Sequence, residues 1–258
     1  MKRPLLHTFL KRIGLFEMAK SIYFLLNKFK ILKKYKTQTG LYYLPFFAFK
    51  DAIRNSIIQN QIFDKHIFDT AKKYILPNSI VIDAGANYGQ YSILFSKVSN
   101  EVEVYSFEAN KFVFEILKKN INANNTKAKI FNNLLGNISK SLINIEKTKL
   151  KTPDYGSQSF KIVSDTDSEQ IEAIKIDDLK FDKKISLLKI DVEGMDYDVL
   201  IGAKNTIKIH KMPIIFEFIK DKNKHSFSDY EKFIKAINYH ISQKIDETNY
   251  LIKHNGQS

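Results

Sequence analysis

The sequence predicts one α/β domain built on an open, mostly parallel sheet and preceded by a helical extension. Three observations lead to this class. From about residue 79 onward, short apolar runs alternate with amphipathic stretches, which is the pattern of βαβ units. Two of these runs end in an acid that is followed by a glycine turn. The length of 258 residues accommodates one such domain with a few dozen residues besides.

Composition narrows the class of protein. A hydrophobic fraction of 44% with 27% charged residues is typical of a globular chain, and no run approaches the roughly 20 apolar residues of a membrane span. The absence of cysteine excludes disulfides, thiolate metal sites and cysteine nucleophiles. The six histidines form no H-x-x-x-H pair, so no histidine zinc site is predicted. We expect a cytoplasmic protein.

The positive charge is concentrated at the start of the chain. Residues 1–40 hold ten basic residues and one acid, which gives +9 of the total of +13. Apolar residues recur there at helical spacing, which predicts two amphipathic helices, the second reaching Leu32. Residues 1–36 could lie on an anionic membrane surface or pack on the chain's own domain, and we favour packing. We therefore divide the chain into a basic helical extension, 1–50, and a catalytic domain, 51–258.

Each element of the domain follows from its local pattern. Residues 51–74 have helical periodicity and lead to Pro77 and Asn78, which are typical of a turn. The turn-rich stretch 142–176 interrupts the alternation and predicts a β-rich insertion or loop, while 240–252 holds one or two closing strands. The strands expected in the sheet are 79–83, 103–107, 128–132, 185–190 and 213–218, and the helices between and after them are 91–97, 111–122, 197–209 and 229–238.

The run from Val81 to Gly89 is the first that carries chemistry. A strand that ends at Asp83 and turns through Gly85 and Gly89 into a helix places free amides and a carboxylate at the carboxyl edge of the sheet, where open α/β sheets bind their ligands. A dinucleotide-binding turn would read G-x-G-x-x-G, but Asn87 stands at the second glycine position. The spacing therefore argues against NAD.

Acids gather at the same edge. Glu108 closes the second strand, where an acid suits a ribose diol of either NAD or S-adenosylmethionine. Asp83, Asp191 and Glu193 also fall at strand ends. Such a rim would repel a pyrophosphate and tolerate a sulfonium and an ammonium. The predicted cofactor is therefore cationic at its reacting end.

Three acids are candidates for catalysis. Asp191 and Glu193 follow a buried strand, and Glu217 lies inside an apolar strand. A carboxylate base suits a hydroxyl nucleophile, so these acids are expected to orient an acceptor or to take its proton. Alternatively, a single acid could cap a helix or pair with a lysine. The three could also hold Mg²⁺ or Ca²⁺, but no ion-loop spacing is met and we predict no metal.

Together these motifs resemble the FkbM family of methyltransferases. The resemblance covers roughly residues 55–220 and includes residues 82–89, 105–110 and 188–194, and Gly202 with the strand near Glu217. It implies a class I methyltransferase sheet of seven strands, the last one antiparallel, with S-adenosylmethionine as cofactor. Residues 132–136, with Asn133 and Leu134, would flank the adenine. The cofactor loop would be formed by Asp83, Gly85, Asn87 and Gly89.

The resemblance also implies roles for the acids and a class of acceptor. Glu108 would bind the ribose hydroxyls, and Asp191, Glu193 and Glu217 would face the acceptor. A sugar hydroxyl on a glycan, glycolipid or natural-product precursor is the implied acceptor. Two departures are Ala109, where the family usually has proline, and Asp196, where it often has glutamate. The alternatives are an RNA methyltransferase and a non-catalytic, membrane-associated module with the same fold.

Overall fold

A computed structural model of the chain describes residues 30–146 and 168–256. The expected helices before residue 30 lie outside these residues, as does the turn at 151–157. None of the helices within the described ranges is both long and apolar enough to cross a bilayer. The predicted division at residue 50 stays a prediction.

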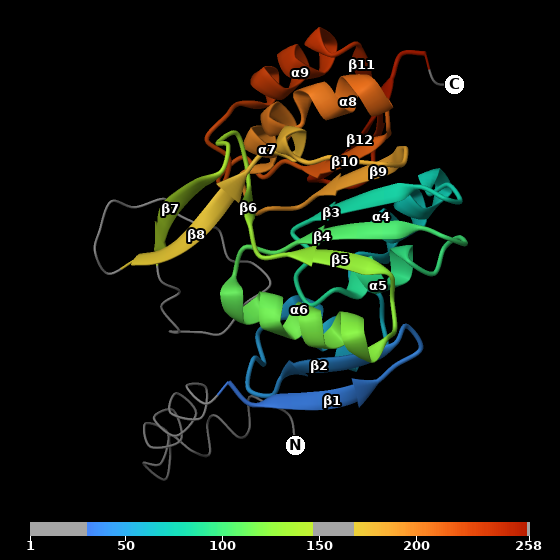
Figure 1. Ribbon diagram of the computed structural model, residues 1–258, viewed down its shortest axis with the longest axis vertical. Helices are drawn as coiled ribbons and strands as arrows, with labels where there is room; N and C mark the ends of the chain where they lie inside the picture. The colour runs from blue at the N-terminus through green and yellow to red at the C-terminus, as the bar shows by residue number, and fades with distance from the viewer. Residues whose placement is uncertain (1–29, 147–167, 257–258) are drawn as a thin grey trace.

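A seven-stranded sheet is the centre of the fold, in the order β11-β12-β10-β9-β3-β4-β5 (Figure 1). β12 pairs antiparallel with β10 and β11, while β3, β4, β5, β9 and β10 pair in parallel. This order, with the last strand reversed, confirms the expected class I methyltransferase sheet. The strands are β3 (Ile80–Ala84), β4 (Glu103–Phe107), β5 (Ala128–Phe131), β9 (Ile185–Ile190), β10 (Ile214–Glu217), β11 (Tyr239–Lys244) and β12 (Asn249–His254).

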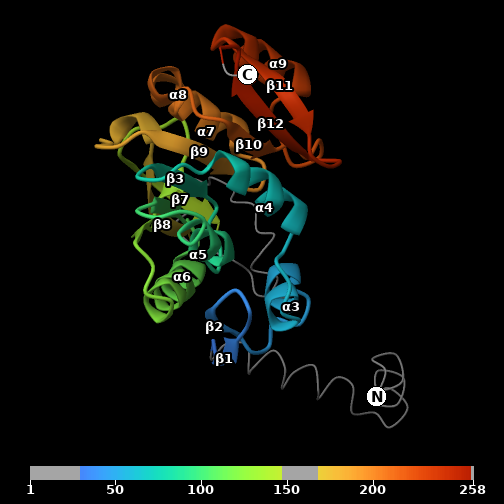
Figure 2. The same cartoon turned by 90° about the vertical axis from the view of Figure 1, so that its right-hand side faces the viewer.

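Helices cover both faces of the sheet (Figures 1 and 2). One face packs against α7 (Asp196–Gly202), α8 (Lys204–His210) and α9 (Phe227–Ala236), in a core that includes Ile82 and Leu188. The other face packs against α4 (Lys65–Ala71) and α5 (Gln90–Phe95) through Val81 and Leu187. Neighbouring residues of a strand thus enter opposite cores, which is why the central strands β3, β9 and β10 are apolar at most positions.

α6 (Lys111–Ala123) begins at a well-defined cap. The Asn110 side chain accepts hydrogen bonds from the backbone N–H groups of Phe112 and Val113, which satisfies two donors that a helix start leaves open. Its buried residues, among them Ile116 and Leu117, recur on one face. This face packs between the sheet and an N-terminal hairpin, whereas Glu115 on the opposite face is exposed.

This hairpin joins β1 (Leu32–Lys36) to β2 (Leu41–Pro45), so the expectation that the second helix reaches Leu32 is wrong. The physical reason is tertiary: α6 supplies polar partners to the second strand. Asn120 accepts from Tyr43 N at 2.6 Å and donates to Tyr88 O at 2.9 Å. The hairpin is thereby fastened to the domain that follows it.

Two predicted helices are each divided in the structure. Residues 51–74 form α3 (Ala52–Ile58), α4 and a short 3₁₀ helix, η1 (Lys72–Tyr74), with left-handed backbone at Asn60 and Asp64 between the first two. Residues 197–209 divide at Ala203 into α7 and α8. Helical periodicity continues across both interruptions, and for that reason the pattern alone did not reveal them.

The expected β-rich insertion is present. A three-stranded sheet in the order β6-β8-β7 follows β5 and precedes a second 3₁₀ helix, η2 (Ile176–Asp178). Its strands are β6 (Leu134–Leu135), β7 (Ser141–Glu146) and β8 (Ser168–Ile174). β6 leads directly from the edge of the large sheet, which brings this insertion beside the carboxyl ends of the strands.

Candidate functional site

The loops that follow β3 and β9 touch at the carboxyl edge of the sheet. Asp191 N donates to Ala84 O at 3.0 Å, and a Cβ added to Gly85 would lie 1.8 Å from Asp191 O. Gly85 also has φ of +81°, a conformation that other residues rarely adopt. Only glycine therefore permits the first motif to lie directly against the second.

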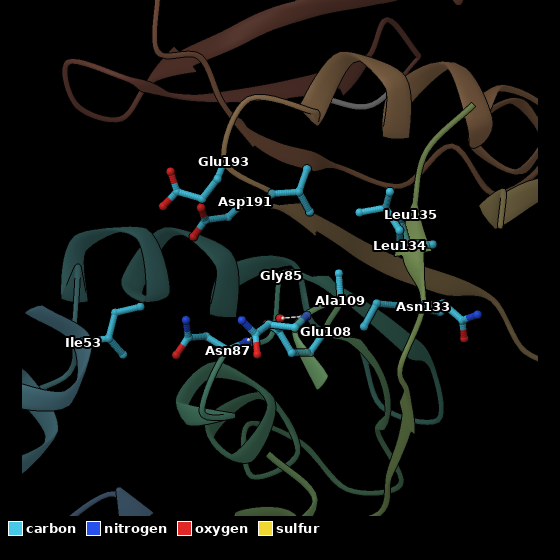
Figure 3. A pocket seen from close by; sticks show the side chains of 13 residues that line it. Ile53, Gly85, Asn87, Glu108, Ala109, Asn133, Leu134, Leu135, Asp191 and Glu193 are labelled. Carbon is cyan, nitrogen blue, oxygen red and sulfur yellow. Dashed lines mark hydrogen bonds between the residues drawn. The ribbon is translucent and has the colours of Figure 1, made fainter. Parts of the chain in front are cut away.

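A pocket opens above this contact, and we call it the main pocket (Figure 3). It contains about 610 Å³ of space, including the part open to solvent. In Figure 3, Asp191 and Glu193 lie across the cavity from Asn87 and Glu108. Its walls are formed by Ile53, Gly85, Asn87, Phe107, Glu108, Ala109, Asn110, Asn133, Leu134, Leu135, Asp191, Val192 and Glu193.

Glu108 is the buried acid of the main pocket. Its carboxylate accepts hydrogen bonds from Asn87 N at 3.0 Å and from Asn110 N at 2.7 Å. Burial raises the pKa of Glu108 to about 7, although these two backbone donors oppose the rise. Each carboxylate oxygen has a second lone pair, so Glu108 retains capacity for a ligand hydroxyl.

A second cavity adjoins the first across the turn at Gly85, and we call it the inner pocket. Both pockets are lined by Ile53, Gly85, Asn87 and Asp191. The remaining walls of the inner pocket are formed by Phe63, Asp83, Ala86, Tyr88, Gln90, Tyr91 and Lys189. Acids therefore line both pockets: Glu108 and Glu193 line the main pocket, Asp83 lines the inner one together with Lys189, and Asp191 lines both.

Lys189 lies between Asp83, at the end of β3, and Asp191, after β9. Its Nζ lies 3.1 Å from Asp191 Oδ2 and 3.7 Å from Asp83 Oδ1, and 5.1 Å from the centre of the Tyr91 ring. The lysine side chain is 6% exposed, whereas that of Asp191 is 38% exposed. Burial alone would lower the pKa of Lys189, but the charges of Asp191 and Asp83 raise it above its ordinary value. Lys189 therefore remains a cation.

Asp83 is completely buried at the end of β3. Its Oδ2 accepts from the Ser92 hydroxyl at 2.6 Å, and Ser92 in turn accepts from Ser106 at 2.8 Å. Its Oδ1 has no hydrogen-bond partner among the described residues. Burial raises the pKa of Asp83, and the Lys189 charge offsets part of that rise. Asp83 therefore lies beneath the loop, where it contacts Ser92 and Lys189.

The remaining acids form a second group beside Asp191. Glu193 has left-handed backbone and pairs with Lys222, so its charge is partly neutralised. The buried Asp196 accepts from Glu217 N at 3.2 Å. Burial, with the charge of Asp191, raises the pKa of Asp196 to about 7, and burial with the charges of Asp191 and Asp196 raises that of Glu217 to about 8. No three histidine, cysteine or acidic side chains within the described ranges are grouped in a way that would hold a metal ion.

The structure brings most of the predicted site residues together, although their roles stay predictions. Gly89 begins α5 and packs on Leu117 rather than lining either pocket, and Glu217 lies beside the site without lining it. The predicted residues that line the main pocket are Gly85, Asn87, Glu108, Asn133, Leu134, Asp191 and Glu193, and Asp83 lines the inner one.

Sequence reasoning missed Lys189 and Ile53. A lysine inside an otherwise apolar strand was the available signal for Lys189, because such a residue is rarely buried without a partner. Ile53 has no such signal: it lines both pockets only because α3 reaches them, and the fold of the whole domain places it there.

The chain is similar to proteins of one family. Residues 83–241 match the sequence profile of the methyltransferase FkbM domain. A protein of Sordaria araneosa, methyltransferase sdnD, is 28% identical over 189 residues, which are 58% of this chain and 70% of that protein. Methyltransferase 1 of Beauveria bassiana is 23% identical over 167 residues, covering 56% of this chain and 66% of that protein.

Solved structures are also similar to it. The crystal structure of methyltransferase FkbM from Methylobacillus flagellatus KT aligns with a TM-score of 0.45 and 18% identity over 69% of this chain. This chain spans 44% of that crystallised protein.

Proposed function

This chain belongs to the FkbM family of methyltransferases, and we propose that it transfers the methyl group of S-adenosylmethionine to a sugar hydroxyl on a glycan, glycolipid or natural-product precursor. The proposal concerns the acceptor and the residues that act on it. It rests on the arrangement of acids around one partly exposed carboxylate, Asp191.

The main pocket fits the adenosine part of the donor. Phe107 and Leu134 offer apolar surface for an adenine ring, and Asn133 lies beside them. Glu108 stands where it can hydrogen-bond ribose hydroxyls, whichever of its protonation states is present. Gly85 and Asn87 bring backbone close to the same space.

The position of Asp191 between the two pockets is the observation on which the proposal rests. Its carboxylate lines both pockets, is 38% exposed and is held by Lys189 from beneath. A group bound across both pockets would therefore pass beside this side chain. An acceptor hydroxyl that approaches from solvent meets Asp191 at that point, within reach of its oxygens.

The proposed chemistry is a single in-line displacement. When bound, S-adenosylmethionine supplies a methyl group on a sulfonium sulfur, which becomes a neutral thioether as the carbon–sulfur bond breaks. The new bond joins the methyl carbon to the acceptor oxygen, and Asp191 accepts the hydroxyl proton. Lys189 holds the Asp191 carboxylate in place for this step.

Glu193 and Glu217 serve the acceptor in a different way. Glu193 is already paired with Lys222. Burial raises the pKa of Glu217 to about 8, so this side chain already holds a proton near pH 7 and cannot accept another. Each is therefore a weaker candidate for the base than Asp191. Both offer oxygens at the rim beside Asp191, and sugar hydroxyls are donors that such oxygens bind. We therefore assign them to binding and orienting the acceptor.

We also propose a cytoplasmic location. Packing of residues 1–36 on the domain remains the favoured expectation, and contact of these residues with an anionic membrane surface, where a glycolipid acceptor would lie, is the alternative that we propose to test. Lys33, Lys34 and Lys36 are exposed on β1, and residues 1–29 lie outside the described ranges. Lysine side chains beside apolar groups suit the interface of such a membrane. Sedimentation with vesicles of phosphatidylserine, compared with neutral vesicles, tests this part.

The acceptor class is tested with methyl-labelled donor. Purified protein is incubated with labelled S-adenosylmethionine and, separately, with glycans, lipid-linked glycans and total RNA. Label is expected in a sugar fraction and, after hydrolysis, in an O-methyl sugar identified by mass spectrometry. Label in RNA alone would overturn the proposed acceptor.

The role of Asp191 is tested with the same reaction. Asp191→Asn should lower the rate by at least about 100-fold, as expected for loss of a general base, while the donor still binds. The matched control is Asp182→Asn, which removes an exposed carboxylate from the loop before β9 and should leave the rate unchanged. An unchanged rate in Asp191→Asn would remove it from the catalytic residues.

A further inference from the structure

We propose that Lys189 binds the α-carboxylate of the methionyl end of S-adenosylmethionine in the inner pocket. This inference rests on the proposed function and assigns a subsite for one end of the donor. It gives a second role to a lysine that already holds Asp191.

The division between the two pockets supports this placement. The donor has an adenosine end and an amino-acid end, joined at the sulfonium. If adenosine occupies the main pocket beside Glu108, the amino-acid end extends past Gly85 and Asp191, the residues that the pockets share. It then lies in the inner pocket, and the sulfonium lies close to Asp191.

Lys189 is the one cation available there. Of all the described residues that line either pocket, no other is a lysine, an arginine or a histidine. Without that cation, the charged side chains around a ligand carboxylate in these pockets would be Asp83, Glu108, Asp191 and Glu193. Repulsion from these acids would oppose its binding, so its position is determined by Lys189.

The ammonium has a donor left for this contact. It carries three N–H groups, and within the described residues its two carboxylate neighbours are Asp191 at 3.1 Å and Asp83 at 3.7 Å. Of the other polar side chains of the wall, Gln90 bonds to Gln61 O and Phe63 N, Tyr91 donates to Phe63 O, and Tyr88 donates to Asp51. Asn87 offers a neutral amide, so Lys189 is the charged donor on that wall.

The charges of the Lys189 cluster and of the reacting end of the donor are complementary. Lys189 with its two aspartates carries a net charge of −1 when both are ionised. The reacting end of the donor has a sulfonium, an ammonium and a carboxylate, hence a net charge of +1. Alternating charges in this way allow each group of the ligand to meet an opposite one, which favours both affinity and a fixed orientation.

The test compares two ligands that differ only in the carboxylate. Calorimetric titration is carried out with S-adenosylhomocysteine and with its decarboxylated analogue. The unaltered protein should bind the former about 10- to 100-fold more tightly, as expected for a charge-assisted hydrogen bond. In Lys189→Met this preference should fall to within about threefold, and Lys189→Arg should restore most of it.

A control lysine separates this contact from a general loss of charge. Lys129 on β5 pairs with Glu103 at 2.9 Å and lies over the Tyr105 ring, so Lys129→Met removes a similarly paired lysine outside both pockets. It should leave the preference unchanged. Circular dichroism checks that each variant is folded, and Lys189→Gln, which keeps a polar side chain beside the aspartates, replaces Lys189→Met if that variant is unfolded.

Each outcome decides the matter. Equal binding of the two ligands by the unaltered protein overturns the proposal without any variant. Equal weakening of both ligands in the Lys189 variants shows a structural role and also overturns it. Failure of the unaltered protein to bind either ligand contradicts the donor itself, and so the proposed function rather than the role of Lys189 alone.

Discussion

Gly85 and Asp191 are in backbone contact, so closely that a methyl group on Gly85 would lie 1.8 Å from Asp191 O. The contact joins the loop after β3, which faces the cofactor, to the carboxylate proposed as base. The relative position of these two parts of the site is therefore set by backbone, and it does not depend on how longer side chains pack.

Gly85→Ala is expected to destabilise the protein by at least about 2 kcal/mol, because it adds both this clash and an unfavourable left-handed backbone. Urea unfolding measures the change. Gly136→Ala is the matched control, since its added methyl would meet nothing closer than 3.8 Å, and it should alter stability by less than about 0.5 kcal/mol. Equal stability of the two variants would contradict the contact.

Glu108→Ala is expected to weaken binding of S-adenosylmethionine by at least about 10-fold. The change removes the proposed ribose partner and the acceptor that holds Asn87 N and Asn110 N. Calorimetry measures the affinity. Glu103→Ala removes the acid at the start of β4, the strand that Glu108 follows. Glu103 lies outside both pockets, so this variant should bind the donor normally. Normal binding by Glu108→Ala would mean that this acid does not contact the donor.

Glu217 makes stability depend on pH. Its pKa rises from 4.5 to about 8 on folding, so the folded state binds the extra proton and its stability falls as the pH rises between about 5 and 8. Glu217→Gln should make this decline in stability shallower. Part of the decline should remain, because the pKa values of Asp196 and Glu108 are also raised, to about 7. The measurement is the urea midpoint across that range. Glu115→Gln, on the exposed face of α6, should leave the slope unchanged, and an unchanged slope in Glu217→Gln would refute the assignment.

Asn120→Ala should destabilise the protein by about 2 kcal/mol, because Tyr43 N and Tyr88 O would lose a buried partner. Asn122→Ala, which alters an exposed residue of the same helix, should change stability by less than about 0.5 kcal/mol. Chemical denaturation measures both variants. Equal values would mean that the hairpin contributes little to the stability of the domain.

The sheet was predictable because its strands are buried on both faces. The apolar runs at 103–107 and 185–190 coincide with β4 and β9, and turn residues delimit each of them. Helix boundaries were less predictable. The interruption at Ala203 leaves the apolar period intact, and the strand at Leu32 depends on Asn120, which is 88 positions away in the sequence.

The site was predictable to the extent that it lies at strand ends. Asp83, Glu108 and Asp191 follow from where their strands stop, because parallel strands bring their carboxyl ends to one edge. The contribution of Ile53 depends on how α3 packs, and that of Lys189 on which acids surround it in space. The local sequence pattern predicts neither of these contributions.

The three-stranded sheet is inserted between β5 and β9, and it reaches the main pocket through β6, with Leu134 and Leu135. The strands that carry Asp83, Glu108 and Asp191 pair only with one another and with β5 and β10. The insertion can accordingly lengthen, shorten or be exchanged for another without disturbing those pairings. Changes confined to β7 and β8 would therefore alter the surroundings of the main pocket while the strands that position the acids stay paired.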